Sequence, residues 1–183
     1  YSIDWQVVED NIGLLKNNKI AQYIANKSIT LVKNNKKLIP MRAGKLKKLT
    51  HLILSTDEDL YRYLKIIDKD IKRTYPNVNK MLINDKLSDS RINSIIDDIK
   101  GSTVVVISML IRIKMDKGES TIDPSHAKLL ERIHEEKIPT IGISFGSPYL
   151  PSYDTLDAYI CAYGYGSISV KAAANALWGR SNI

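Results

Sequence analysis

The sequence predicts one α/β domain, in which an open, mostly parallel sheet of about five or six strands lies between two layers of helices. Short apolar runs alternate along the chain with amphipathic helical stretches, a pattern typical of parallel sheets. The apolar runs are continuous rather than alternating, most clearly at residues 104–107, and such runs suit strands covered on both faces. A length of 183 residues fits one domain, and 44% apolar residues suffice for its core.

Six apolar runs are the expected strands. In chain order they are residues 29–33, 51–55, 80–84, 103–110, 140–144 and 158–162. Ligands of open parallel sheets bind beyond the carboxyl ends of the strands. A site is therefore expected among residues 55–58, 84–88, 112–123 and 144–149.

Amphipathic helices are expected between the strands. Apolar side chains recur every three or four residues and so share one helix face, first at Leu60, Tyr63, Leu64, Ile67 and Ile71, then at Ile92, Ile95, Ile96 and Ile99. Ser88 or Asp89 begins the second of these helices, and Asp123 with Pro124 begins the next one. The last helix is expected at about residues 169–178, where alanines allow a close approach to the sheet and Gly179 ends it.

The formal charge of +7 comes from Lys and Arg residues spread along the chain, without a block of five or more. Aromatic residues do not interleave with the basic ones, as they would on a base-stacking surface. A solvated lysine surface is therefore favoured over a nucleic-acid interface. We also find no apolar run long enough to span a membrane.

Several cofactor and metal chemistries are excluded by pattern. The dinucleotide-binding pattern G-x-G-x-x-G is absent, and residues 55–58 are acidic and lack the glycine of a phosphate loop. His51, His126 and His134 are too scattered to form a metal site. Cys161 is the single cysteine, so no disulfide can form within the chain, and its apolar surroundings predict a buried, inert thiol. We expect no cofactor and no metal.

Four segments carry a resemblance to a known family. They are residues 24–34 with 38–41, residues 157–164, residues 172–179, and the motif Ser144-Phe145-Gly146-Ser147-Pro148-Tyr149. In this order and at this spacing they resemble the C-terminal α/β domain of family 3 glycoside hydrolases, whose motif has Asn where this chain has Ser147. The resemblance implies a three-layer α/β/α sandwich in a flavodoxin-like arrangement, covering roughly residues 20–180.

The resemblance also implies that an N-terminal (β/α)8 barrel of the same parent chain carries the nucleophile, an Asp. In many members a loop after the Val-rich strand presents a Glu as acid/base, but here the strand continues through residues 108–112. We therefore expect no catalytic residue in this domain; Glu119, the one Glu of the loop 112–123, is a poor candidate. Arg112, Lys114 and Asp116 of this loop are expected to reach toward the sugar pocket.

This departure resembles the β-N-acetylhexosaminidase-like branch more than the β-glucosidase-like branch, because the former carries a His acid/base on the barrel. The parent reaction would be retaining hydrolysis of terminal β-linked sugars. Carbohydrate would bind only in the full-length enzyme, and the fragment alone is expected to be inactive. A non-catalytic binding or interaction domain on the same scaffold is the alternative.

Residues 1–18 are expected to be a linker or the end of an upstream region, and residues 19–183 the domain itself. Trp5, Tyr149, Leu150 and Tyr153 lie outside the periodic core pattern, so we expect them to form an apolar patch where the barrel docks. The chain begins at Tyr1 without Met, which fits an upstream region in the parent. The compartment stays open; a bacterial parent would be periplasmic, lipid-anchored or secreted.

Overall fold

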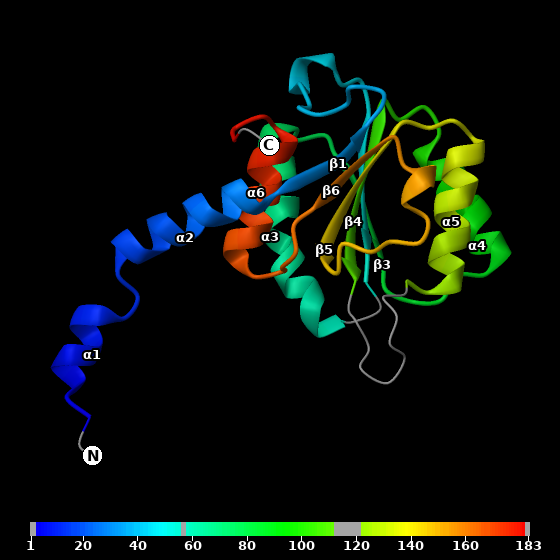
Figure 1. The fold of residues 1–183 in the computed structure, drawn as a ribbon. Coiled ribbons are helices and arrows are strands. Elements are labelled where there is room, and N and C mark those ends of the chain that lie inside the picture. The colour runs from blue at the N-terminus through cyan, green and yellow to red at the C-terminus, as the bar shows by residue number, and fades with distance from the viewer. Residues whose placement is uncertain (1–2, 56–57, 112–121, 182–183) are drawn as a thin grey trace.

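A six-stranded sheet forms the centre of the molecule in a computed structural model, which describes residues 3–55, 58–111 and 122–181 (Figure 1). The strand order is β1-β6-β5-β4-β2-β3, and within the described residues only β1 runs antiparallel to its neighbour. The strands are β1 (Thr30–Asn34), β2 (Leu49–Leu54), β3 (Asn79–Ile83), β4 (Val104–Ile111), β5 (Thr140–Gly146) and β6 (Ala158–Cys161). All six lie at the predicted positions, with ends that differ by at most two residues.

Helices cover both faces of the sheet. On one face lie α2 (Leu15–Ser28), α3 (Glu58–Thr74) and α6 (Ser167–Leu177); on the other lie α4 (Asp89–Ile99) and α5 (Pro124–Glu135) (Figure 1). Two short 3-10 turns, η1 (Ala43–Lys45) and η2 (Tyr153–Thr155), belong to the connections. The predicted open, mostly parallel α/β/α sandwich is confirmed.

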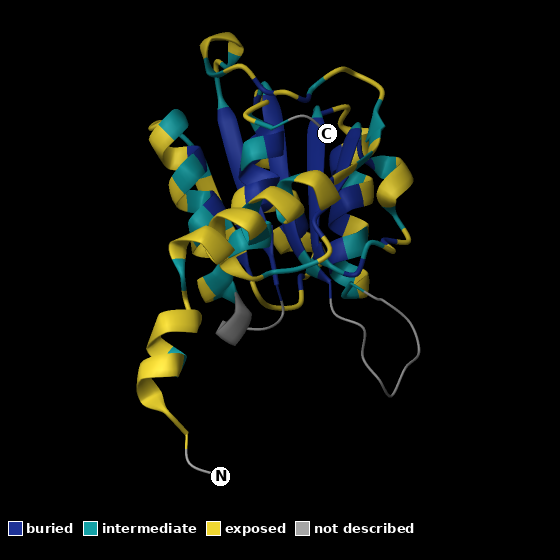
Figure 2. Ribbon diagram, turned by 60° about the vertical axis from the view of Figure 1, so that its left-hand side comes forward, coloured by how far each residue is buried: buried dark blue, intermediate teal, exposed yellow. Residues whose placement is uncertain are grey.

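The hydrophobic core has two layers because each face of the sheet is buried by its own helices. Leu64, Ile67 and Ile71 of α3 are fully buried on one side, and the four isoleucines of α4 are buried on the other. The central strands β2 and β4 are buried along almost their whole length, as Figure 2 shows. Burial on both faces is the physical reason that these strands read as continuous apolar runs.

Local sequence signals set the predicted helix ends. The Ser88 hydroxyl accepts a hydrogen bond from the backbone N–H of Arg91 at 3.3 Å, and the Asp123 carboxylate accepts one from that of Ser125 at 2.9 Å. Each bond satisfies a backbone N–H that has no partner within the helix. Gly179 follows α6 with φ of +67°, a conformation that glycine adopts without strain.

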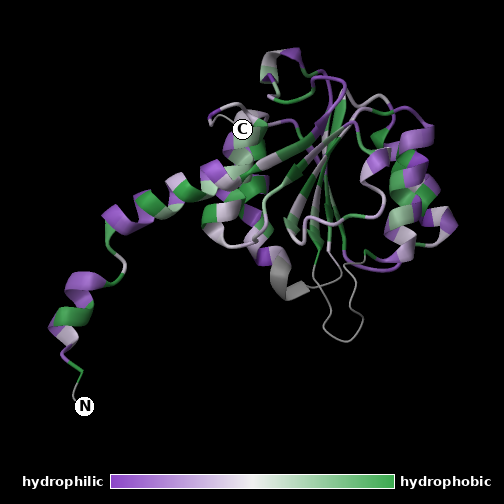
Figure 3. Cartoon of the chain, viewed as in Figure 1, coloured by the Kyte–Doolittle hydropathy of each residue, from purple (hydrophilic) through white to green (hydrophobic). Residues whose placement is uncertain are grey.

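The N-terminal segment differs from the rest of the chain. Helix α1 (Trp5–Asn11) has no buried residue and extends away from the sheet, and α2 begins at Leu15, so the predicted boundary after residue 18 falls inside a helix (Figure 1). Both helices carry apolar side chains that are exposed to solvent (Figure 3). No helix of the described residues is both long and apolar enough to cross a membrane.

Candidate functional site

The carboxyl edge of the sheet is the candidate site, because the segments that follow β2, β3, β5 and β6 all leave the sheet there. Ser55 follows β2, and its backbone N–H donates to the carbonyl of Ile83 at 3.0 Å. His126 at the start of α5 is buried and donates from Nε2 to the carbonyl of Asp85 at 2.9 Å. These bonds fix two neighbouring loops of the edge to the rigid body of the domain.

The motif at residues 144–149 forms a tight exit from β5. Gly146 has φ of +103°, and a Cβ at this position would lie 2.3 Å from the carbonyl oxygen of Ile111. That same oxygen accepts a hydrogen bond from the N–H of Ser147 at 2.9 Å. The buried hydroxyl of Ser144 donates to the carbonyl of Ser147 and closes the turn. Only glycine fits this close approach, which explains its place in the motif.

Ser147 acts within the turn and holds Tyr149 in place. The Ser147 side chain is buried, and its Oγ accepts a hydrogen bond from the N–H of Tyr149 at 3.3 Å. The Tyr149 side chain itself is 75% exposed. The turn is therefore a rigid support that presents an aromatic ring to solvent at the carboxyl edge.

Tyr159 and Cys161 brace the far side of this turn. The Tyr159 hydroxyl donates to the carbonyl of Pro148 at 2.8 Å, and the Cys161 thiol lies 3.8 Å from the same oxygen. Burial raises the pKa of the Tyr159 hydroxyl, and burial likewise raises the pKa of the Cys161 thiol. The thiol is buried and neutral at physiological pH, which suits the predicted structural role rather than that of a nucleophile.

The predicted docking patch is not supported as a single surface. Leu150 is 4% exposed and belongs to the core on the α4 and α5 side, so its predicted exposure was wrong. Trp5 is 70% exposed on α1, whereas Tyr153 lies on η2, which packs against α5 on the opposite side of the sheet (Figure 1). The Tyr153 ring stacks on that of Tyr159 with centroids 6.1 Å apart. Arg112, Lys114, Asp116 and Glu119 lie outside the described residues.

A buried polar network under α3 was missed by the sequence analysis. His51 on β2 lies between Ser108 on β4, at 2.9 Å from its Nε2, and Asp68 on α3, at 3.2 Å from its Nδ1. Burial lowers the pKa of His51 and outweighs the hydrogen bond and charge of Asp68, so the ring is neutral. Because a carboxylate can only accept, Nδ1 carries the proton, and Nε2 accepts from the Ser108 hydroxyl.

This Ser–His–Asp order is the one that activates serine nucleophiles. Here, however, both Ser108 and His51 are 0% exposed, so no substrate can reach the hydroxyl. Lys80 completes the network through its ion pair with Asp68 at 2.7 Å. Partial burial raises the pKa of Asp68, but hydrogen bonds from His51 and Lys80 outweigh it and hold the pKa below its usual value. The network is a satisfied polar cluster of the core.

No metal centre forms among the described residues, since they contain no cluster of three or more His, Cys, Asp or Glu side chains that could hold an ion. The three histidines have separate structural roles. His51 is part of the buried network, His126 bonds the loop after β3, and His134 Nδ1 donates to the carbonyl of Thr155 at 2.9 Å.

Comparison with known proteins finds similarity in structure alone, because no protein-family model and no curated protein sequence matches the chain. A glycoside hydrolase family 3 β-N-acetylglucosaminidase from Paenibacillus sp. str. FPU-7 superimposes with a TM-score of 0.66 and 17% identity, over 94% of this chain and 32% of that one. The β-glucoside phosphorylase BglX gives a TM-score of 0.63 and 19% identity, over 93% of this chain and 31% of its own.

A fungal multi-domain GH3 β-N-acetylglucosaminidase has a TM-score of 0.73 at 14% identity, over 91% of this chain. Our chain spans 18% of the fungal chain and about a third of the other two. Because the sequence identities of these matches are below 20%, the matches show the fold alone. The expected resemblance to the family 3 enzymes is confirmed at that level: this chain has the α/β fold found in one part of family 3 glycoside hydrolases.

Proposed function

We propose that this chain is the C-terminal accessory α/β domain of a family 3 glycoside hydrolase, packed against a catalytic barrel of the same parent chain. The observation that carries the proposal is the coverage of the structural matches. Family 3 enzymes match over more than nine-tenths of this chain, while the match takes up a third or less of their own length. A domain with that relation to larger enzymes is expected to work together with the remainder of a parent chain.

The carboxyl edge is the surface we propose for contact with the barrel. Open parallel sheets bind their ligands at this edge, and the turn at residues 144–149 presents the exposed ring of Tyr149 there. The exposed apolar side chains of the N-terminal segment that holds α1 and α2, among them Trp5, Ile12 and Leu15, are a second candidate contact. Apolar side chains gathered in this way on a surface usually mark an interaction site.

We propose retaining hydrolysis of terminal β-linked sugars as the parent reaction, in the N-acetylhexosaminidase-like branch, with the catalytic groups on the barrel. Two features of this domain support the placement of the catalytic groups on the barrel. Strand β4 runs through Ser108 to Ile111 without a Glu, and the Ser108 hydroxyl is buried in the core. In this proposal the domain shapes one wall of the sugar pocket through Arg112, Lys114 and Asp116.

The isolated chain should therefore not hydrolyse aryl β-glycosides. We would assay the purified chain on nitrophenyl β-glucoside and nitrophenyl β-N-acetylglucosaminide, together with the same domain joined to its parent barrel. The expected result is turnover by the joined protein alone. Turnover by the isolated chain that persists through repurification would refute the proposal that the catalytic groups lie on the barrel. A parent chain without a barrel would favour the alternative, a non-catalytic binding domain.

In the full-length parent, the change Arg112→Ala should lower kcat/KM by about tenfold, which corresponds to about 1.4 kcal/mol of transition-state stabilisation. A loss of this size is expected when one contact weakens while the acid/base stays in place. Unchanged kinetics would remove this residue from the pocket. A loss of several thousandfold would show that the domain itself carries catalytic machinery.

A further inference from the structure

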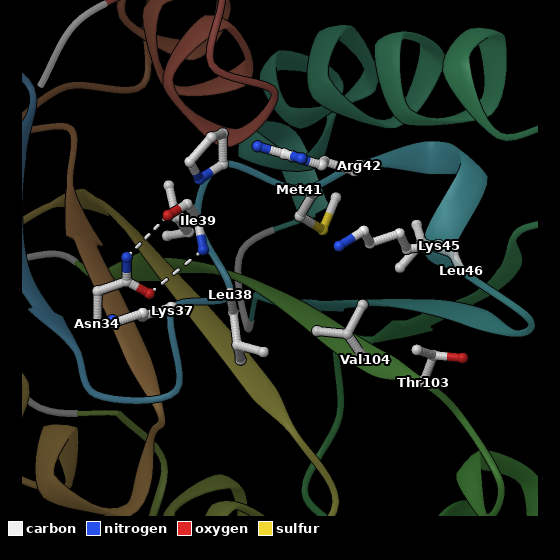
Figure 4. Close-up of a pocket in the computed structure, with 11 residues that line it drawn as sticks. Asn34, Lys37, Leu38, Ile39, Met41, Arg42, Lys45, Leu46, Thr103 and Val104 are labelled. Carbon is white, nitrogen blue, oxygen red and sulfur yellow. Dashed lines mark hydrogen bonds between the residues drawn. The ribbon is translucent and has the colours of Figure 1, made fainter.

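A pocket lies at the amino edge of the sheet, the end opposite the proposed barrel contact. Its volume is about 540 Å³, within the range of small-molecule sites. It lies between the segment that joins β1 to β2 and the start of β4 (Figure 4). Its lining residues are Asn34, Lys37, Leu38, Ile39, Pro40, Met41, Arg42, Lys45, Leu46, Thr103 and Val104.

The walls of this amino-edge pocket are held in place by hydrogen bonds. The Asn34 side chain binds the backbone of Ile39 at both ends, donating to its carbonyl at 2.8 Å and accepting from its N–H at 3.2 Å. The N–H of Met41 donates to the carbonyl of Leu177 at the end of α6, at 2.8 Å. A pocket with fixed walls needs little ordering when a ligand binds.

The floor of the pocket is apolar and its rim is cationic. Leu38 and Val104 are among the apolar lining residues, and the Lys45 ammonium group extends toward Met41 (Figure 4). Neither Asp nor Glu is among the lining residues of the described chain, and no aromatic side chain is. Across the described residues, the side chains of Lys37, Arg42 and Lys45 have neither an ion pair nor a hydrogen bond.

The surrounding sequence strengthens this positive field. Residues 11–56 hold ten of the 27 Lys and Arg residues and none of the 20 Asp and Glu residues. The remainder of the chain, with 17 basic and 20 acidic residues, is slightly negative. The excess positive charge of the protein is thus concentrated in the segment that builds the pocket, and clefts lined by one sign of charge attract ligands of the other.

We propose that the amino-edge pocket binds a small organic phosphate, whose apolar part lies on Leu38 and Val104 and whose phosphate lies among the rim cations. A phosphate monoester carries close to two negative charges at neutral pH, which suits several unpaired cations better than a carboxylate does. The Arg42 guanidinium can bind phosphate oxygens in a bidentate manner. The inference does not depend on the glycosidase proposal, because it concerns the opposite edge of the sheet.

The test is a titration at pH 7.5 followed by NMR of the methyl groups of Leu38 and Val104. Benzyl phosphate is the probe, and benzyl alcohol and inorganic phosphate are the matched controls. Saturable shifts with benzyl phosphate at a Kd at least tenfold below that of either control are expected. No saturable shift would overturn the proposal. If benzyl alcohol bound as tightly as benzyl phosphate, the rim cations would not contribute to binding and the proposal would be wrong. If inorganic phosphate bound as tightly, the apolar floor would not contribute, and the proposal would be wrong as well.

Charge reversal then locates the site. The double change Arg42→Glu and Lys45→Glu should weaken benzyl phosphate binding by at least tenfold. The control Lys16→Glu and Lys19→Glu on α2 changes the net charge equally, within the same basic segment, but away from the pocket lining. It should change the Kd by less than about twofold, since distant surface charges are screened by salt. If both double variants weakened benzyl phosphate binding equally, the ligand would be attracted by the net charge of the segment rather than by the pocket, and the proposed site would be refuted.

Discussion

Protonation of the buried His51 should make the domain less stable as the pH falls. Burial lowers the pKa of this ring in the folded state below its ordinary value of 6.5. Below pH 6.5, therefore, His51 binds a proton in the unfolded chain but stays neutral in the folded domain until the pH reaches its lowered pKa. The stabilisation is complete above pH 6.5 and is lost as the pH falls from there toward the folded-state pKa.

The magnitude follows from proton linkage. Each pH unit in this window removes about 1.4 kcal/mol per group, so at pH 5.5 the free energy of unfolding should be lower by up to about 1.4 kcal/mol than at pH 7.5. Asp68 does not confuse the measurement, because its lowered pKa yields stability that is lost only below about pH 3.8. Lys80 does not contribute to the pH dependence in this range either, since the stability from its raised pKa is lost only above pH 10.5.

The assay is denaturant unfolding at pH 7.5, 6.5 and 5.5 of the natural chain and the variant His51→Gln. Glutamine offers a donor to Asp68 and an acceptor to Ser108 but does not titrate. The variant should be the less stable protein at pH 7.5, and its free energy of unfolding should fall less with acid. Parallel curves for the natural chain and His51→Gln would refute the reasoning.

Two further substitution pairs test the carboxyl edge, both by denaturant unfolding. Gly146→Ala should cost about 1–3 kcal/mol, since the new Cβ would meet the carbonyl oxygen of Ile111 at 2.3 Å, whereas Gly44→Ala has free space and should change little; equal effects would contradict the close approach. Leu150→Ala should cost about 2–5 kcal/mol because the side chain is buried, and Tyr149→Ala should stay within about 0.5 kcal/mol; a costly Tyr149→Ala would mean that its ring packs inside this domain.

The turn at residues 144–149 shows what a local pattern can predict about the site. Gly146 and Pro148 follow an apolar run, so a tight exit at the carboxyl edge could be expected from their backbone preferences alone. Whether the next two side chains are buried or exposed could not be predicted in this way. Tyr149 and Leu150 are adjacent and both apolar in character, yet one ring is exposed and the other side chain lies in the core. Which of the two faces inward depends on the path of the chain over α5 and β6.

Short residue patterns were enough to predict the strands, the amphipathic helices and their capped ends, because apolar periodicity and capping residues can be recognised within a few positions. Ser88 and Asp123 cap helices that begin at the next residue, and the run at 104–107 lies in a strand covered on both faces. Which polar groups meet depends on how distant segments of the chain pack against one another. His51 finds Asp68 and Ser108 from positions 17 and 57 residues away. The amino-edge pocket likewise joins Asn34 of β1 to Val104 of β4, although β6 and β5 separate these strands in the sheet, because the connection from β1 to β2 passes beside the start of β4.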